Sequence, residues 1–165
     1  MDSIPQFLIA APTSGSGKTT VSRGLMALFV KKGLKVQPFK CGPDYIDTKY
    51  HEAVCGRPSI NLDTFMASPE HVGGLYARYS ADADVAVVEG MMGMYDGYDR
   101  DRGSSAEVAR LLGIPVVLVV DAKSAAIPWL LCCRVHQFPS GYTYCGSYLQ
   151  SCRLAPPLPD AAGGL

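Results

Sequence analysis

A glycine-rich turn between an apolar run and an amphipathic stretch most constrains how this chain of 165 residues can fold. The turn reads Ala11-Pro-Thr-Ser-Gly-Ser-Gly-Lys-Thr-Thr20, after an apolar run at 7–11 and before an amphipathic stretch at 21–32. A strand, a glycine-rich turn and a helix that opens on Gly-Lys-Thr are typical of a phosphate-binding P-loop. In that motif, backbone N–H groups converge on phosphate oxygens at the start of the helix. We therefore expect the chain to bind a nucleoside triphosphate.

The turn supplies the residues expected to hold ATP and Mg²⁺. Lys18 would reach the β- and γ-phosphates, and the Thr19 hydroxyl would ligate the metal ion. The expected nucleotide-binding residues are Thr13, Gly15, Ser16, Gly17, Lys18, Thr19 and Thr20. A Gly/Ser-rich linker that happens to contain Gly-Lys-Thr is the alternative, and the flanking strand and helix disfavour it.

Two positions depart from well-known versions of the motif. Pro12 stands where the standard pattern has its first glycine. Thr13 stands where one large class of dimeric ATPases has a second lysine. The absent lysine counts against a switch ATPase of that class.

Strands and helices are expected to alternate along residues 1–126. The predicted strands are 7–11, 34–39, 85–89 and 114–120, and the predicted helices are 19–32, 69–79 and 104–112. Residues 40–63 look rich in loops, with one short helix near 49–54, and Pro38 predicts an edge position or a strand end. Such alternation is typical of an α/β fold with a mostly parallel sheet flanked by helices. The loops that follow the strands, beginning near Pro12, Lys40, Gly90 and Asp121, would then meet at one edge of the sheet.

Composition narrows the function classes. The formal net charge is zero and no basic cluster exceeds Lys31-Lys32, so nucleic-acid binding is not expected. The longest aliphatic run, 116–120, is too short to span a bilayer, and we expect a cytoplasmic protein with no membrane partner. The six cysteines form no C-x-x-C pair and are expected to be free thiols.

The chain changes character after residue 126. Residues 127–165 contain only three charged side chains, those of Arg134, Arg153 and Asp160, but four of the six cysteines. They show no sustained helical or strand period, and 156–165 has the composition of a disordered segment. We therefore divide the chain into a P-loop domain at 1–126 and a divergent tail at 127–165. Our hypothesis is that the tail comes from a shifted or misjoined reading frame, which the other two frames of the coding DNA would test.

Further polar residues follow the predicted strands and are candidates for catalysis. Glu89 ends a buried strand beside the P-loop, where a carboxylate can bind Mg²⁺ directly or through water; the alternative is a solvated strand end. Lys40 leaves the second strand and could steady a phosphate or an acyl phosphate. Asp44 and Asp47 could meet a metal ion or substrate, or could form a turn that caps the next helix.

Weaker signals surround these candidates. Asp96 is flanked by glycine in the loop beyond Glu89, and could contact substrate or form an ordinary turn. The segment 61–63 could be a local cap. The three histidines are scattered, and structural roles are favoured for them. No Ser/His/Asp or Cys/His nucleophile arrangement is visible.

Four segments in order resemble the N-terminal domain of the cobyrinate a,c-diamide synthase family, in the dethiobiotin synthetase-like group of P-loop proteins. They are 11–20, 37–47 (Gln-Pro-Phe-Lys-Cys-Gly-Pro-Asp-Tyr-Ile-Asp), 57–63 (Arg-Pro-Ser-Ile-Asn-Leu-Asp) and 87–97 (Val-Val-Glu-Gly-Met-Met-Gly-Met-Tyr-Asp-Gly). The resemblance covers about residues 5–126, and Pro12 is normal in that group.

The resemblance implies an ATP-dependent ligase of cobalamin biosynthesis. ATP would phosphorylate a side-chain carboxylate of the corrin ring, and ammonia would then displace the phosphate, first at c and then at a. Asp44, Asp47 and Glu89 match the metal-binding and phosphoryl-transfer carboxylates of the family, with Asp44, Glu89 and Thr19 as the metal set. Tyr45, Ile46 and Asp96 match positions that recognise the corrin.

The chain also departs from the family. Family members are longer and make their ammonia in a C-terminal glutamine amidotransferase domain, which nothing here matches. The alternatives are a nickel-sirohydrochlorin a,c-diamide synthase, a regulatory P-loop ATPase and an inert truncated product. A homodimer is a further possible assembly.

Overall fold

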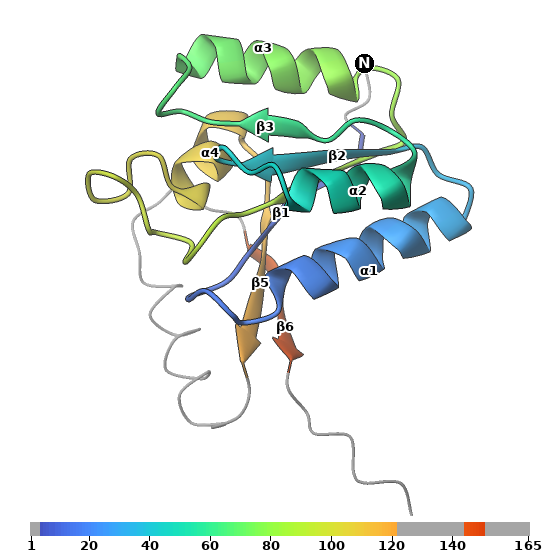
Figure 1. Cartoon of the computed structure of the whole chain (residues 1–165), viewed down its shortest axis with the longest axis horizontal. Helices are drawn as coiled ribbons and strands as arrows, with labels where there is room; N and C mark the ends of the chain where they lie inside the picture. The colour runs from blue at the N-terminus through green and yellow to red at the C-terminus, as the bar shows by residue number, and fades with distance from the viewer. Residues whose placement is uncertain (1–3, 122–143, 151–165) are drawn as a thin grey trace, which may run out of the picture.

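The computed structural model describes residues 4–121 and the strand at 144–150 (Figure 1). The elements are β1 (Gln6–Ala10), α1 (Lys18–Lys31), β2 (Val36–Cys41), α2 (Asp47–Cys55), β3 (Ile60–Leu62), α3 (Pro69–Ser80), β4 (Val85–Glu89), α4 (Ser105–Leu112), β5 (Val116–Asp121) and β6 (Tyr144–Gln150). The strand order in the sheet is β3-β2-β4-β1-β5-β6, and every described pair of strands is parallel. The predicted α/β class with a parallel, helix-flanked sheet is confirmed.

The described helices cover both faces of the sheet and enclose two separate cores. Helices α1 and α2 pack against one face, where Ile9, Met26 and Val87 belong to one buried cluster. Helices α3 and α4 cover the other face, where Leu8 and Val72 belong to the second cluster. Figure 1 shows α1 and α2 together on one side, with α3 on the other. Neighbouring residues of a strand enter different cores because strand side chains alternate between faces.

The same alternation decides which side chains can meet at the ends of the strands. In β4, Val85 and Val87 belong to the core under α1 and α2, whereas Ala86 and Val88 belong to the other core. Glu89 continues the first series and therefore faces α1 and α2. In the β2–β4 register Lys40 lies directly beside Glu89.

Helix boundaries largely follow the predicted signals. The Ser68 side chain accepts a hydrogen bond from the N–H of His71 at the start of α3. At α4, the Ser104 side chain accepts from the N–H of Glu107. The Glu107 carboxylate accepts from the N–H of Gly103 at 2.6 Å, just before the helix begins.

Two features of the sheet differ from the predictions. The second strand ends at Cys41, so Lys40 lies within it and not in the loop that follows. That strand is internal and Pro38 lies within it, contrary to the edge position or strand end predicted from Pro38. Its pairing with β3 begins only at Phe39, so Pro38 has a strand partner on the β4 side alone.

Two strands were not predicted. β3 has only three residues, too few to give a recognisable alternation. β6 lies in the tail for which no strand period was expected, and it pairs with β5. The rest of the tail, including the predicted disordered end, lies outside the described residues, and the hypothesis of its origin stays a prediction.

Candidate functional site

The turn between β1 and α1 has the backbone shape of an anion cradle. Gly15 and Gly17 have φ values of 78° and 87°, in the left-handed region that glycine adopts without strain. The Ser16 hydroxyl donates to the carbonyl of Thr13 and lies 3.1 Å from the Thr13 hydroxyl, which closes the turn. No side chain caps the start of α1, so its first N–H groups remain available to an anion. Thr20 lies exposed on the first turn of α1.

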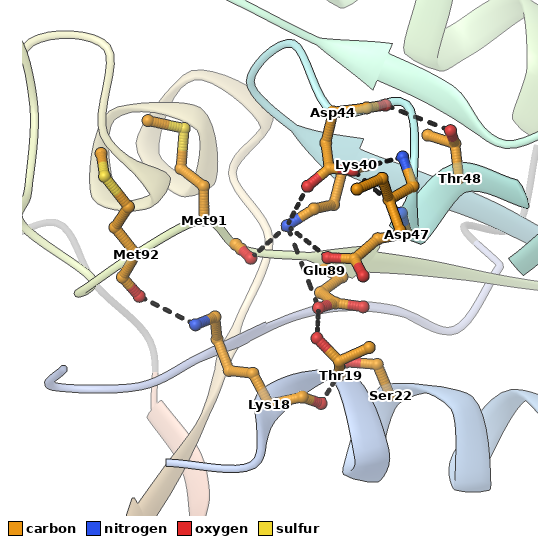
Figure 2. Close-up of polar contacts among 12 residues, drawn as sticks. Lys18, Thr19, Ser22, Lys40, Asp44, Asp47, Thr48, Glu89, Met91 and Met92 are labelled. Atoms are coloured by element: carbon orange, nitrogen blue, oxygen red, sulfur yellow. Dashed lines mark hydrogen bonds and ion pairs between the residues drawn. The ribbon is translucent and has the colours of Figure 1, made fainter. Parts of the chain in front are cut away.

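Lys18 links this turn to the loop after β4. The side chain is buried, and its Nζ donates to the carbonyl of Met92 at 2.9 Å (Figure 2). Burial lowers the pKa of Lys18, and the neighbouring charge of Lys40 lowers it further. Met92 has a φ of 41°, unusual for a residue with a side chain. The predicted phosphate lysine therefore already touches the loop that carries Asp96.

Thr19 and Glu89 are in direct contact, as Figure 2 shows. The Thr19 hydroxyl donates to Oε1 of Glu89 at 2.6 Å. Glu89 is fully buried, and burial alone would raise its pKa. Hydrogen bonds from His51 and Thr19, with the charge of Lys40, outweigh burial and lower the pKa of Glu89 below its usual value. The carboxylate is thus held ionised beside the P-loop.

Lys40 stands among the three predicted carboxylates. Its Nζ donates to the carbonyl of Gly90 at 2.9 Å and lies 3.4 Å from a carboxylate oxygen of Asp47. The carboxylates of Asp44 and Glu89 each have an oxygen 3.9 Å away from Nζ. Burial raises the pKa of Asp47 and so does the charge of Glu89, while Lys40 opposes both. The four predicted catalytic residues form one cluster (Figure 2).

Asp44 combines the two roles that its spacing left open. Oδ1 accepts from the N–H groups of Ile46 and Asp47 at 2.8 and 2.9 Å, which fastens the start of α2. Oδ2 is the oxygen that faces Lys40. The turn predicted as an alternative is therefore present, and it aims the carboxylate into the cluster.

The three predicted substrate residues lie at the rim. Tyr45 and Ile46 are 80% and 70% exposed, so their large apolar side chains face solvent. Asp96 accepts from the N–H of Gly93 at 2.8 Å and shapes the loop locally, which matches the ordinary turn considered for it. Asp63 likewise accepts from the N–H of Phe65, the local cap expected there.

An apolar cavity of about 240 Å³ opens beside the rim. Its lining residues are Pro43, Asp63, Phe65, Met91, Met92, Gly97, Tyr98 and Gly103. The rings of Phe65 and Tyr98 pack edge to face with centroids 4.8 Å apart, and both side chains are largely exposed. Oδ2 of Asp63 is buried and has no hydrogen-bond partner within the described protein. The cavity thus offers a largely apolar wall beside the site.

His51 belongs to the site, although a structural role was favoured for it. Its ring is fully buried, with Nε2 2.7 Å from Oε2 of Glu89. The only sequence signal is its spacing of four residues from Asp47, which puts both on one face of α2. The other predicted structural histidine within the described residues, His71, lies exposed on α3.

The oxygen donors of the site suit Mg²⁺ better than a softer metal ion. Among residues 4–121 no group of three or more His, Cys, Asp or Glu side chains is arranged as a complete metal cage. Mg²⁺ commonly takes one or two carboxylates and keeps waters and phosphate oxygens as its other ligands. The adjacent hydroxyl of Thr19 and carboxylate of Glu89 fit that pattern.

Two further predictions concern cysteines and membranes. Cys41 and Cys55 are free thiols, as expected; the side chains of the other four lie outside the described part of the chain. Within the described residues, no helix is both long and apolar enough to cross a bilayer.

Comparison with known families identifies the described domain. The model of the CobQ/CobB/MinD/ParA nucleotide binding domain matches residues 7–126. Hydrogenobyrinate a,c-diamide synthase of Streptomyces coelicolor is 54% identical over 123 residues, covering 73% of this chain and 25% of that protein. Cobyrinate a,c-diamide synthase of Salmonella typhimurium is 50% identical over 122 residues, covering 73% and 27%. The chain thus spans about a quarter of the length of these curated relatives.

Solved structures share the fold at low sequence identity. The signal recognition particle receptor FtsY from Elizabethkingia anophelis aligns with a TM-score of 0.65 at 17% identity, over 90% of this chain and 51% of that one. Signal recognition particle 54 kDa protein from Aeropyrum pernix aligns with a TM-score of 0.58 at 22% identity, over 83% and 34%. These matches support the P-loop architecture alone.

Proposed function

The chain belongs to the CobQ/CobB/MinD/ParA nucleotide-binding domain family, and we propose that it forms the ATP-binding domain of an amide-forming ligase that acts on the a- and c-carboxylates of cobyrinate. The observation that carries the proposal is the cluster of Lys40, Asp44, Asp47 and Glu89 beside the P-loop. The similarity to cobyrinate and hydrogenobyrinate a,c-diamide synthases supports the substrate class.

The proposed reaction has two steps. A carboxylate oxygen of the substrate attacks the γ-phosphorus of ATP, the bond to the β-phosphate oxygen breaks, and ADP leaves. The nitrogen of ammonia then attacks the acyl carbon, phosphate leaves with the bonding electron pair, and loss of a proton from nitrogen gives the amide. Lys18 and Lys40 would offset the negative charge that gathers during the first step.

The residues of the P-loop edge would position the reactants. Thr13, Gly15, Ser16, Gly17 and Thr20 would surround the phosphates together with Lys18. Thr19, Glu89 and Asp44 would hold Mg²⁺, which when bound would neutralise phosphate charge. Asp47 would keep the Lys40 ammonium in place, because it is the nearest carboxylate to Nζ.

The rim offers a surface suited to a large flat substrate. Tyr45 and Ile46 would contact the macrocycle with their exposed apolar side chains. The cavity lined by Phe65 and Tyr98 is too small for a whole tetrapyrrole, but it would admit one edge or side chain. Asp96 would contact the substrate from the loop beyond β4. Ammonia would come from glutamine hydrolysed at a separate site.

Trapping the acyl phosphate tests the proposal without glutamine. The full chain is incubated with MgATP, cobyrinate and hydroxylamine, which converts an acyl phosphate into a stable hydroxamate. We expect a hydroxamate that requires ATP and cobyrinate and is lost in Glu89→Gln. ATP hydrolysis that ignores the tetrapyrrole and yields no hydroxamate would overturn the ligase in favour of a regulatory ATPase. Faster hydroxamate formation with nickel sirohydrochlorin would reassign the substrate.

A further inference from the structure

We propose that His51, supported by Ser59, is a positioning residue that fixes the orientation of the Glu89 carboxylate at the phosphoryl-transfer site. The inference rests on the proposed function of that site, and it assigns a role to a side chain that does not itself touch the substrate. Nε2 of His51 lies 2.7 Å from Oε2 of Glu89, and Nδ1 lies 3.1 Å from the hydroxyl of Ser59.

The two oxygens of Glu89 are fastened from two different elements. Thr19, on α1, donates to Oε1, while His51, on α2, contacts Oε2. A carboxylate held at one oxygen can still rotate about its terminal bond, whereas one held at both has a fixed plane. The side chains of His51 and Glu89 are both completely buried, so water does not compete for this contact.

The spacing of two residues on α2 corresponds to the pairing of two residues across β2 and β4. Lys40 and Glu89 are direct partners across β2 and β4. Asp47 and His51 are one helical turn apart on α2, and they contact Lys40 and Glu89 respectively. One turn of helix thus positions one cation and one carboxylate. A purely structural histidine would require no such correspondence with the site.

The hydrogen-bonding groups of Ser59, His51 and Glu89 determine which atom donates to the Glu89 carboxylate. A carboxylate oxygen accepts, so the proton of the contact belongs to Nε2 of His51. The Ser59 hydroxyl can donate to Nδ1 or accept from it, and either arrangement keeps the ring from turning. Partners of this kind behind a metal-binding carboxylate typically change activity or metal affinity by about 10–100-fold when removed.

Paired substitutions separate positioning from packing. His51→Gln keeps an N–H donor close to the place of Nε2, whereas His51→Leu fills similar space without a donor. We expect His51→Leu to lower kcat/KM for MgATP in hydroxamate formation about 10–100-fold, and His51→Gln to recover most of the loss. His71→Leu, on exposed α3, is the matched control and should match the parent chain. Equal losses in both His51 variants, or no loss in His51→Leu, would overturn the proposal.

Binding measurements decide the question even if the chain makes no hydroxamate. A fluorescent ATP analogue is titrated with and without Mg²⁺. We expect His51→Leu to lose most of the gain in affinity that Mg²⁺ gives the parent chain, while affinity without the metal stays unchanged. Parent chain that gains nothing from Mg²⁺, or a variant that keeps the gain, refutes positioning. Absent hydroxamate with the expected metal dependence would instead overturn only the proposed ligase activity.

A third readout needs neither metal nor turnover. The buried Nε2 proton of His51 should give a downfield, slowly exchanging proton resonance that disappears in His51→Gln and shifts in Ser59→Ala. If His51→Leu does not fold, Ser59→Ala takes its place, with an expected kcat loss of about 2–10-fold. An Nε2 proton that exchanges at the rate of exposed His71 would contradict the contact.

Discussion

Lys40 is a buried cation whose charge is matched at close range. Three carboxylates lie within 4 Å of Nζ, and the nearest belongs to Asp47. Taking one partner out of a buried ionic cluster leaves the remaining charges uncompensated, which costs more than an exposed ion pair is worth. The side chain is therefore important to the local fold, and the proposed function also gives it a part in catalysis.

Replacing Lys40 by methionine tests both roles. We expect Lys40→Met to lower the rate of hydroxamate formation by about 10²-fold or more, because a preorganised charge at the transferred phosphoryl group is lost. The melting temperature should also fall, since Asp47 and Glu89 would then repel each other. Lys49→Met removes an exposed lysine from α2 and should change neither quantity. An unchanged rate in Lys40→Met would contradict the assigned role.

At the residue scale, the sequence predicted the charged residues of the site better than the residues that hold them in place. Lys40 and Glu89 lie at the ends of two strands, and Asp44 and Asp47 lie at the start of a helix. Parallel strands bring such positions to one edge. His51 was not predicted as a site residue because its partner, Glu89, is 38 residues away in the sequence. Only the packing of α2 on β2 brings the two together. The unpaired Oδ2 of Asp63 was equally invisible, since nothing in 61–63 indicates which oxygen is buried.

The loop after β4 packs tightly against the P-loop at Gly93. A Cβ added there would lie 2.6 Å from the carbonyl oxygen of Pro12 and 2.8 Å from Oδ2 of Asp96. One residue later, the N–H of Met94 donates to the carbonyl of Ala11 at 2.7 Å. The absence of a side chain at Gly93 is what lets the two loops touch.

Gly93→Ala should therefore separate the two loops. We expect a loss of about 1–3 kcal/mol in unfolding free energy, as for other overpacked sites, together with weaker nucleotide binding. Gly24→Ala is the control, because its Cβ would meet nothing within 4 Å and it lies inside α1. That change should stabilise the fold by about 0.5–1 kcal/mol through helix propensity. Urea unfolding measures the stability of the two variants, and nucleotide titration measures their affinity. Equal stability of the two variants would refute the close packing.

Elements with strong local signals were predicted and weak ones were missed. Ser68 and Ser104 mark helix starts by their own hydrogen bonds, so sequence alone suffices for α3 and α4. β3 depends on its neighbour, because three residues have no period of their own. The internal place of β2 could not be inferred from Pro38, since it depends on where β3 begins to pair.

At the scale of the whole molecule, burial of a tyrosine in one of the two cores predicts that the folded chain loses stability at alkaline pH. Burial raises the pKa of Tyr76 from its ordinary value of 10.0 to about 12, and the Tyr76 hydroxyl donates to Oε1 of Gln6 at 2.8 Å. The folded chain then holds this proton more tightly than the unfolded chain does. Its contribution is complete below pH 10 and is lost as the pH rises to 12, a change of about 2–3 kcal/mol. Tyr76→Phe should flatten this part of the profile in urea unfolding; an unchanged slope would contradict it.

Nucleotide binding should stabilise the entire domain. A ligand at 100 times its Kd adds about 2.7 kcal/mol to the unfolding free energy if it binds only the folded state. We expect MgATP to raise the melting temperature of the parent chain and of Lys32→Ala, which alters an exposed residue at the end of α1. Lys18→Ala should lose the increase. A similar increase in all three proteins would place the nucleotide elsewhere.

Successive residues of β4 face the two cores in turn, and this limits where the domain can lose a residue during evolution. Deleting one residue within Val85–Glu89 would exchange the partners of both cores and turn Glu89 away from Thr19 and His51. The same deletion in the exposed loop at 97–102 would leave every strand in register. Homologous domains can therefore differ in the length of this loop, and so in the shape of the rim. The lengths of the central strands have to stay constant.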